Sequence, residues 1–234
     1  MATYVMSDIH GEYRKFLRML EKIGFADDDD LFILGDFVDR GPEPVELLLD
    51  TMNRPNVYPI MGNHDLFAMD ILSKLSVDIT EDNAESQVDI TAMNELIDWL
   101  CEGGKSTMDG FQKLGNEQRR EVLEYISDFS LYEVIDVGER TFILVHAGLG
   151  NYAPGKKLSQ YTREELLLSR PDPAVKYVTD DSVFIVTGHT PTLYYTGKAE
   201  ICRIHNNILI DCGACSPEGR LACLCLDSMK EYYI

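Results

Sequence analysis

The sequence is poor in basic side chains. It holds 21 Lys and Arg residues against 40 Asp and Glu residues, which gives a formal net charge of -19 and a pI near 4.5. A surface of this charge repels polyanions, so we expect no binding to nucleic acid and no binding to an anionic membrane. A small phosphorylated substrate is still compatible with it, because a bound cation can invert the local field.

Long apolar runs and a disulfide pattern are also missing. No stretch approaches the roughly 20 residues that cross a bilayer, and Met1 to Met6 leads straight into a polar motif, so we expect no signal peptide. Six cysteines in 234 residues are too few for a disulfide scaffold and are typical of reduced thiols. We therefore expect a cytoplasmic protein with a substantial core, since 45% of its residues are hydrophobic.

Four of the five histidines lie in short motifs rich in Gly, Asp or Asn, and each motif follows an apolar run typical of a buried strand. A fifth motif of the same kind carries two aspartates and an arginine. In chain order the motifs are Asp8-Ile9-His10-Gly11, Gly35-Asp36-Phe37-Val38-Asp39-Arg40-Gly41, Gly62-Asn63-His64-Asp65, His146-Ala147-Gly148 and Gly188-His189-Thr190-Pro191. Because strand ends meet at one edge of an α/β sheet, we expect these motifs to form one site.

Strand-like and helix-like spacings alternate at the start of the chain. The pattern predicts strands at 4–6, 31–34 and 57–61, separated by helices at 12–23 and 42–52. This order favours parallel strands joined by right-handed crossovers.

The pattern then changes to a helical one and back to strands. Residues 66–130 read as a mostly helical insertion with a break at Gly103-Gly104. Later strands are expected at 131–137, 141–145, 183–186, 200–204, 208–211 and 221–226, and the last three are expected to be antiparallel. The predicted fold is a single α/β domain over 1–234, with two packed mixed β-sheets flanked by helices.

The residue types in the motifs suit a site for two metal ions. Asp8 and His10 stand two positions apart, so both side chains can reach one ion. Asp36 has two carboxylate oxygens and can bridge this ion to a second one. Neutral ligands for the second ion would then be Asn63, His146 and His189. Oxygen and nitrogen ligands without thiolate favour Mn²⁺, with Fe or Zn²⁺ as alternatives.

The neighbouring residues suit phosphoryl chemistry. Two ions about 3.5–4 Å apart can activate a shared water and clamp a phosphoryl group during in-line displacement. His64 stands beside a candidate ligand but its side chain diverges from it, which makes it a candidate general acid. Asp39 is the expected carboxylate partner of His64, with Asp65 as the less favoured choice. The planar guanidinium of Arg40 suits phosphate oxygens.

The five motifs together resemble those of the calcineurin-like metallophosphoesterases. Within that family they are similar to the serine/threonine protein phosphatase branch, including bacteriophage lambda phosphatase and symmetrical diadenosine tetraphosphate hydrolase. The closing Ile210-Asp211-Cys212-Gly213-Ala214 resembles the family segment I-D-T-G. The resemblance implies the same ligands, one ion on Asp8, His10 and Asp36 and a second on Asp36, Asn63, His146 and His189. It also implies His64 as acid, Asp39 as its partner and Arg40 on phosphate.

Two further positions refine the resemblance. Many phosphodiesterase and nuclease relatives end in G-H-x-H, whereas Pro191 stands at the last position here, which favours the protein phosphatase branch. The phage enzymes carry a second phosphate-binding arginine after the H-A motif, and Arg170 lies at a comparable place.

We therefore predict an enzyme, a metallophosphoesterase that hydrolyses phosphomonoesters without a phosphoenzyme. The predicted substrate is phosphoserine or phosphothreonine in proteins, and phosphotyrosine or a small phosphoester is also compatible. The alternative is a symmetrical dinucleoside polyphosphate hydrolase, and a non-catalytic scaffold is disfavoured because no motif residue is missing.

Two other features have plainer interpretations. The spacing of Cys212, Cys215, Cys223 and Cys225 is compatible with zinc, but 221–226 is apolar on both faces, so core cysteines are favoured. The segment 75–110 holds nine acidic residues against one lysine. We interpret it as a solubilising surface, with the sharper hypothesis of an acidic rim that favours basic phosphopeptides.

Overall fold

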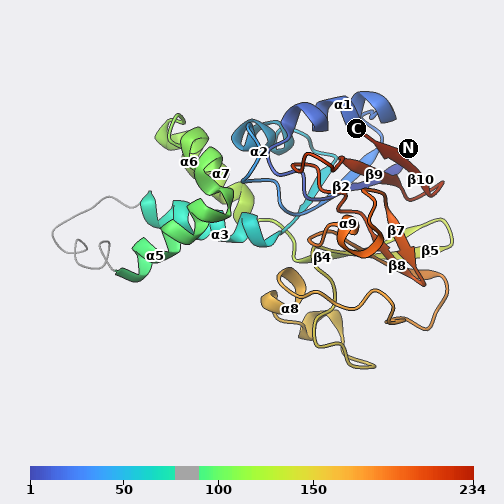
Figure 1. Ribbon diagram of the computed structural model, residues 1–234. Coiled ribbons are helices and arrows are strands. Elements are labelled where there is room, and N and C mark those ends of the chain that lie inside the picture. The colour runs from blue at the N-terminus through green and yellow to red at the C-terminus, as the bar shows by residue number, and fades with distance from the viewer. Residues whose placement is uncertain (77–89) are drawn as a thin grey trace.

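The computed structural model describes residues 1–76 and 90–234, whose strands form two five-stranded sheets (Figure 1). The first sheet has the order β10-β9-β1-β2-β3. Its strands are β1 (Thr3–Met6), β2 (Asp30–Leu34), β3 (Val57–Ile60), β9 (Ala222–Cys225) and β10 (Lys230–Tyr233). The second has the order β4-β5-β6-β8-β7. Its strands are β4 (Tyr132–Val137), β5 (Arg140–Val145), β6 (Val183–Thr187), β7 (Cys202–Ile204) and β8 (Asn207–Leu209).

Both sheets are mixed, which confirms the predicted fold class. In the first sheet β1, β2 and β3 are parallel, and β9 is antiparallel to both β1 and β10. In the second, β5, β6 and β8 are parallel, while β4 and β7 are antiparallel to their neighbours. Each sheet therefore has a parallel centre, where the carboxyl ends of neighbouring strands lie together.

The expectation of three antiparallel strands at the end of the chain was partly wrong. β7 and β8 do form an antiparallel hairpin, but β8 runs parallel to β6, and β9 joins the other sheet beside β1. The sequence reading also missed β10, because Lys-Glu-Tyr-Tyr has no apolar run and pairs along one edge only. His205 lies exposed in the turn between β7 and β8, as expected.

The side chains of each strand divide between two apolar layers. Val5 in β1 faces the second sheet and packs with residues such as Leu144 and Val186, whereas Met6 faces the helices and packs with Phe16 and Leu47. This alternation follows from the two-residue period of a strand. The parallel strands are therefore covered on both faces, which fixes their register.

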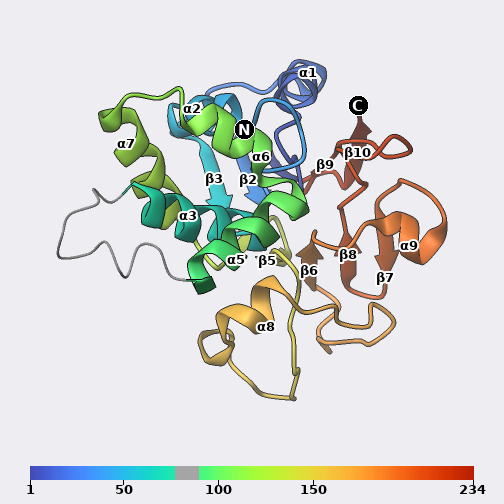
Figure 2. The same cartoon turned by 60° about the vertical axis from the view of Figure 1, so that its left-hand side comes forward.

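The helices occupy the outer faces of the sheets. Over the first sheet lie α1 (Tyr13–Ile23), α2 (Pro44–Met52), α3 (Asn63–Leu75), α5 (Ile90–Trp99), a π-helical turn (Leu100–Gly104), α6 (Lys105–Phe111) and α7 (Asn116–Ser127), as Figure 2 shows. The short helices η2 (Leu158–Gln160), α8 (Arg163–Leu167) and α9 (Thr192–Thr196) accompany the second sheet. In the described residues no helix is both long and apolar enough to span a bilayer.

Local sequence explains where these helices begin and end. Phe16, Met19 and Leu20 form the buried face of α1, which ends at Gly24 with a left-handed φ of 66°. Pro44 begins α2, where its missing N–H costs nothing. The expected break at Gly103-Gly104 is present, since Gly103 has a φ of 107° inside the π-helical turn.

The four cysteines whose spacing is compatible with zinc do not form a metal-binding cluster in the described residues. Cys223 and Cys225 lie buried in β9, and all six cysteines are free thiols. The clusters of possible metal ligands found among residues 1–76 and 90–234 contain none of them. Cys223 and Cys225 are core residues, as the apolar strand pattern predicts, and Cys212 is buried as well, whereas Cys215 is half-buried.

Asp65 ties the loop after β2 to the start of α3. Its fully buried carboxylate accepts hydrogen bonds from the backbone N–H groups of Asp36 (2.8 Å), Phe37 (2.8 Å), Val38 (3.3 Å) and Gly62 (3.0 Å). Four amides on one carboxylate hold two motif-bearing segments at a constant separation.

Replacing Asp65 should therefore destabilise the fold. Asp65→Ala leaves several buried N–H groups unpaired, which should cost at least about 3 kcal/mol of unfolding free energy, and Asp65→Asn should cost less. The exposed Asp70→Ala, on the same helix, should change stability by under about 0.5 kcal/mol. Urea denaturation in the presence of a chelator measures all three, and equal values for Asp65→Ala and Asp70→Ala would contradict this role.

Candidate metal centre

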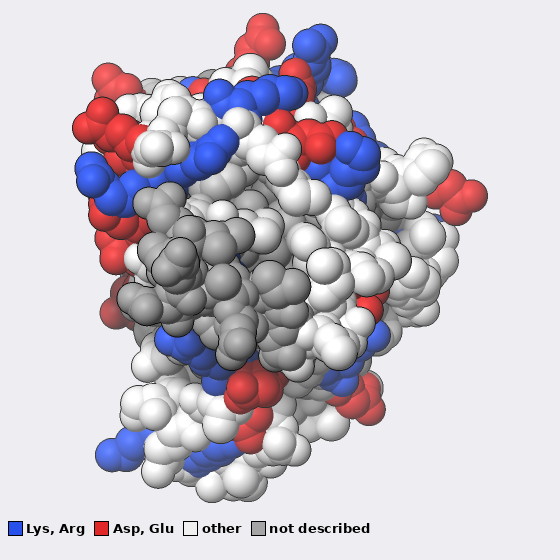
Figure 3. All heavy atoms as spheres, turned by 90° about the vertical axis from the view of Figure 1, so that its left-hand side faces the viewer, with Lys and Arg blue, Asp and Glu red and all other residues white. Residues whose placement is uncertain are grey.

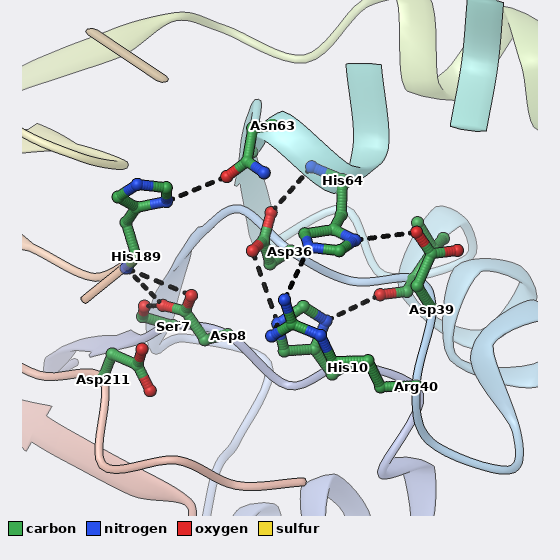
Figure 4. Close-up of polar contacts among 12 residues, drawn as sticks. Ser7, Asp8, His10, Asp36, Asp39, Arg40, Asn63, His64, His189 and Asp211 are labelled. Atoms are coloured by element: carbon green, nitrogen blue, oxygen red, sulfur yellow. Dashed lines mark hydrogen bonds and ion pairs between the residues drawn. The ribbon is translucent and has the colours of Figure 1, made fainter. Parts of the chain in front are cut away.

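The motif residues come together at the carboxyl ends of strands from both sheets (Figure 4). Asp8 and His10 follow β1, and Asp36 follows β2. The remaining candidate ligands follow three further strands, with Asn63 after β3, His146 after β5 and His189 after β6. Residues separated by up to 181 positions thus share one site because their strands end at one edge.

The backbone at this edge is conformationally unusual. Nine non-glycine residues of the described ranges have a positive φ, and six of them are candidate site residues, Asp8, His10, Asp36, Asp39, Arg40 and His189. Each such residue costs on the order of 1–3 kcal/mol, and the surrounding hydrogen bonds must offset this. For example, the amide of His10 donates to Asp36 O at 2.8 Å. Strain of this kind gathers where side chains must be aimed precisely at a common point.

The carboxylate of Asp36 lies at the centre of the site. Its Oδ2 is 3.4 Å from His10 Nε2, and its Oδ1 is 3.5 Å from His146 Nε2. Two groups of three residues each bring their ligand-type atoms within 4.8 Å of one another inside the group, and Asp36 belongs to both. They are His10, Asp36 and His64, and Asp36, His146 and His189. One oxygen thus faces each group, which is the arrangement a bridging carboxylate needs.

The imidazoles present lone pairs to the centre. His10 Nδ1 donates to Val38 O (2.8 Å) and His146 Nδ1 donates to Leu34 O (2.7 Å), which turns the Nε2 atom of each ring toward the centre. His146 Nε2 then lies 2.9 Å from Asn63 Oδ1, so two ligand-type atoms lie side by side. A cation between such atoms would satisfy both, and the donor set therefore fits a metal ion.

Burial and charge favour the ligating forms. Burial lowers the pKa of His10 and of His189 to about 3, so both imidazoles are neutral near pH 7, as metal ligands must be. Burial alone would raise the pKa of Asp36, but His146 and His10 outweigh it and lower that pKa below its ordinary value. Asp36 is therefore ionised, and its charge stays buried at 2% exposure.

Asp8, which belongs to neither group, is oriented by Ser7 and by the backbone of His189. Its carboxylate accepts from the hydroxyl of Ser7 and from the backbone N–H of His189 at 2.9 and 3.1 Å. A Cβ at Gly188 would lie 2.1 Å from Asp8 Oδ2, so only glycine permits this approach. Burial, together with the nearby charges of Asp211 and Asp36, raises the pKa of Asp8. This concentration of buried acids is electrostatically unfavourable unless a cation is present.

The candidate acid lies beside the same centre. His64 Nδ1 contacts Asp39 Oδ2 at 2.8 Å, and Asp65 is occupied by the backbone amides described above. Burial opposes the charged form of His64, but the hydrogen bond to Asp39 outweighs it and raises the pKa of His64. Arg40 places Nη1 2.7 Å from His10 Nε2 and Nη2 2.8 Å from His64 Nε2. The guanidinium therefore stands over both rings, at the mouth of the candidate centre.

Arg170 makes no hydrogen bond or ion pair with the other candidate residues and lies on the surface beside them. It is exposed on the loop after α8 and lines a small pocket with residues that include Gly188 and Thr190. Its charge contributes to lowering the pKa of His189, which places it on the same side of the site. The resemblance to the phage enzymes therefore predicted an arginine that lies on the His189 side of the site.

Three residues that contact site side chains escaped the sequence reading. Ser7 donates to Asp8, while Trp99 Nε1 and Thr107 Oγ1 donate to the two oxygens of Asp39 at 2.9 and 2.7 Å. The only available signal was that the sole tryptophan of the chain stands four residues before Gly103-Gly104. Nothing in the local pattern indicates that this segment reaches Asp39.

Comparison with known protein families now identifies the family. Residues 1–212 match the model of the calcineurin-like phosphoesterases. The chain belongs to this family. It is therefore a hydrolase, and the family uses divalent metal ions, for which the two groups around Asp36 provide suitable side chains.

The chain is also similar to named bacterial enzymes. A symmetrical bis(5'-nucleosyl)-tetraphosphatase of Proteus mirabilis (strain HI4320) is 26% identical over 99% of this chain and 74% of its own length. The enzyme of the same name from Shewanella sp. (strain W3-18-1) is 36% identical over 102 residues, which cover 43% of this chain and only 37% of that relative.

Solved structures share the fold. A protein crystallised as a candidate diadenosine tetraphosphatase has a TM-score of 0.65 at 17% identity, covering 99% of this chain and 92% of its own. A Saccharomyces cerevisiae serine/threonine phosphatase with similarity to human phosphatase PP5 has a TM-score of 0.61 at 16% identity, covering 97% of this chain and 72% of its own. At these identities the likeness concerns the fold alone.

The geometry predicts separate effects for Asp36 and His64. Asp36→Asn removes the charge that faces both groups, so affinity for both ions should fall by at least about 100-fold. That is the largest loss of metal affinity typical for removing a group that only hydrogen-bonds to a metal ligand. His64→Asn should keep most of the bound metal while lowering turnover by roughly 10²–10⁴-fold. Metal content by mass spectrometry after dialysis against a weak chelator measures the difference. Equal metal loss in both variants would refute this division.

Proposed function

We propose that this phosphoesterase hydrolyses symmetrical dinucleoside polyphosphates, and that it splits diadenosine tetraphosphate into two ADP. The observation that carries the proposal is the similarity to the Proteus mirabilis enzyme along 99% of this chain. This reverses the order expected from the sequence, where protein phosphoserine and phosphothreonine came first. The comparisons support the alternative better than that first expectation.

In this proposal the metal ligands are those expected from the motifs, Asp8, His10, Asp36, Asn63, His146 and His189. Bound divalent ions, with Mn²⁺ as the favoured choice, would supply an activated water and withdraw charge from the phosphoryl oxygens. Asp36 serves both positions because each of its oxygens faces a different histidine. The buried carboxyl groups of Asp36, Asp8 and Asp211 would favour bound cations there, since a cation stabilises their ionised forms.

The chain's own side chains would then orient and protonate the substrate. Water would attack one of the two central phosphorus atoms in line with the oxygen that joins them, and the bond from the attacked phosphorus to that central oxygen would break, so that each half leaves as ADP. Arg40, whose guanidinium stands over His10 and His64, would contact the equatorial oxygens, with Arg170 as a second contact. His64 would give its Nε2 proton to the departing oxygen, and Asp39 stabilises the charged imidazole.

A neighbouring pocket offers room for a nucleoside. It has a volume of about 480 Å³ and lies between α3 and α8, where Asn63 forms part of its wall. Leu66, Phe67 and Leu167 provide apolar surface, and the ring of Phe67 is suited to stacking on a base. Arg163 adds a positive charge at the wall, next to the acidic Asp70 and Glu164, so the apolar side chains rather than charge favour a nucleoside there. The pocket therefore connects the candidate centre to a surface that suits the body of a nucleotide.

One observation favours phosphomonoesters as a second candidate. ADP is a good leaving group, whereas a serine or threonine alkoxide needs a proton as it departs. The buried pair of His64 and Asp39, at 2.8 Å, is built to provide that proton. The centre therefore contains the proton donor that hydrolysis of a phosphoprotein would need.

The acidic-rim hypothesis bears on this second candidate. Five of the nine acidic residues fall in 77–89, outside the described residues. Of the others, Glu95 pairs with Lys74 and Asp109 pairs with Lys105, each at 2.5 Å. Figure 3 shows acidic and basic side chains interspersed on the face that carries this segment. Preference for basic phosphopeptides stays a prediction.

A substrate panel with Mn²⁺ present tests the proposal. Diadenosine tetraphosphate should be converted to ADP alone, and its kcat/KM should exceed that of phosphoserine, phosphothreonine and phosphotyrosine peptides by at least about tenfold, or 1.4 kcal/mol. Ion-exchange chromatography separates ADP from the AMP and ATP of asymmetric cleavage. Faster turnover of the peptides would replace the proposed function with the second candidate. The Asp36→Asn variant is the control for contaminating hydrolases.

A further inference from the structure

The carboxylate of Asp39 joins the two-sheet body to the helical insertion. Its Oδ2 accepts from His64 Nδ1 at 2.8 Å and from Trp99 Nε1 at 2.9 Å, and its Oδ1 accepts from Thr107 Oγ1 at 2.7 Å. The hydroxyl of Thr107 in turn accepts from the backbone N–H of Asp39 at 2.9 Å. Both insertion residues therefore bind the partner of the candidate acid directly.

These contacts are shielded from solvent. Asp39 and Trp99 are 0% exposed and Thr107 is 1% exposed. Bulk water therefore cannot replace a lost donor, and the carboxylate would keep an unpaired lone pair. Three donors on two oxygens also fix the rotation of the carboxylate, and this rotation decides how Oδ2 meets His64.

The π-helical turn shapes the segment so that both donors reach one carboxylate. Gly103, with its φ of 107°, turns the chain between α5 and α6, and its carbonyl accepts from the backbone N–H of Arg40 at 3.0 Å. A Cβ at Gly104 would lie 2.3 Å from Trp99 Cε2, so the backbone packs flat on the indole. The segment 99–107 therefore holds Asp39 and Arg40 together, and π-helical turns often accompany functional sites.

We propose that Trp99 and Thr107 are positioning residues for the general acid, acting on His64 through Asp39. The inference rests on the proposed function only in requiring that the chain hydrolyses phosphoesters with His64 as proton donor. The helical insertion is then part of the machinery that delivers the proton, in addition to contributing to the core.

Dependence on the leaving group tests this role. Nitrophenolate departs without a proton, whereas phenolate, whose pKa is about 10 as in tyrosine, benefits from one. A general acid raises the rate by about 10²–10⁴-fold. Losing one of the two hydrogen bonds that orient Asp39 should therefore lower kcat for phenyl phosphate by about tenfold. The same change should lower kcat for p-nitrophenyl phosphate by less than about threefold, with KM unchanged. The variants are Trp99→Phe, which keeps a ring without N–H, and Thr107→Val.

A double-mutant cycle separates positioning from general damage. In a His64→Asn background, Trp99→Phe and Thr107→Val should each change kcat by less than about twofold, because the group they orient is gone. Thr107→Ser restores the hydroxyl and should return phenyl phosphate turnover to within about threefold of wild type. The two Thr107 variants carry the test if Trp99→Phe does not fold.

The controls use other features of this chain. Thr51 is a buried threonine whose hydroxyl donates to the carbonyls of Leu47 and Leu48 in α2 and contacts none of the site residues, so Thr51→Val is the matched control and should not change the leaving-group dependence. Trp99 is the only tryptophan, so its fluorescence shows whether the segment stays buried in the Thr107 variants. Metal content should equal that of wild type in every variant except those at Asp36.

Two results overturn the inference. The first is an equal loss for both aryl phosphates at unchanged metal content, and the second is an undiminished effect in the His64→Asn background. Either would show that Trp99 and Thr107 only maintain structure. A wild-type protein that hydrolyses neither the aryl phosphates nor diadenosine tetraphosphate would instead overturn the proposed function, and the inference with it. If the wild type is active and the variants give either of the two results above, the inference fails while the proposed function stands.

Discussion

The central constraint in this structure is the burial of negative charge around Asp36. Asp8, Asp36 and Asp211 are each less than 5% exposed, and burial lowers the pKa of the nearby His10 and His189 so that these two imidazoles are neutral. Charges of one sign repel strongly where little water screens them. A protein retains such a cluster only if something in it offsets the repulsion, and here the offset is expected from divalent cations.

The rest of the molecule can be understood as support for that cluster. Strained residues follow the strands at the point where side chains must face the centre, and packed sheets hold those strands in register. Asp65 connects the loop after β2 to α3 through four backbone amides. The insertion then reaches Asp39 through Trp99 and Thr107. Strain at the centre is thus offset by hydrogen bonds and packing elsewhere.

Substrate choice depends on parts of the molecule outside the centre. A dimetal site treats an anhydride and an ester alike, because it acts on the phosphoryl group that both share. The features that differ between the two candidate functions are the pocket beside Asn63 and the buried dyad of His64 and Asp39. The pocket suits a nucleotide, and the dyad suits a poor leaving group. The same centre can therefore serve either substrate, depending on which feature dominates.

The fold class followed from local patterns because apolar periodicity is a local property. The parallel order of β1, β2 and β3 could be inferred from the alternation of strands and helices. The pairing of β8 with β6 and the addition of β10 beside β9 could not. Those pairings depend on which sheet edge is free after the chain has packed.

The sequence by itself determined the family and the candidate side chains of the site, because its short motifs contain both kinds of information. Only the tertiary structure decided which atoms meet. The two oxygens of Asp36 face different histidines, and Trp99 comes to Asp39 from 60 residues away. Residue type and spacing carry information about nearby positions, whereas contacts across the fold depend on how all the elements pack together.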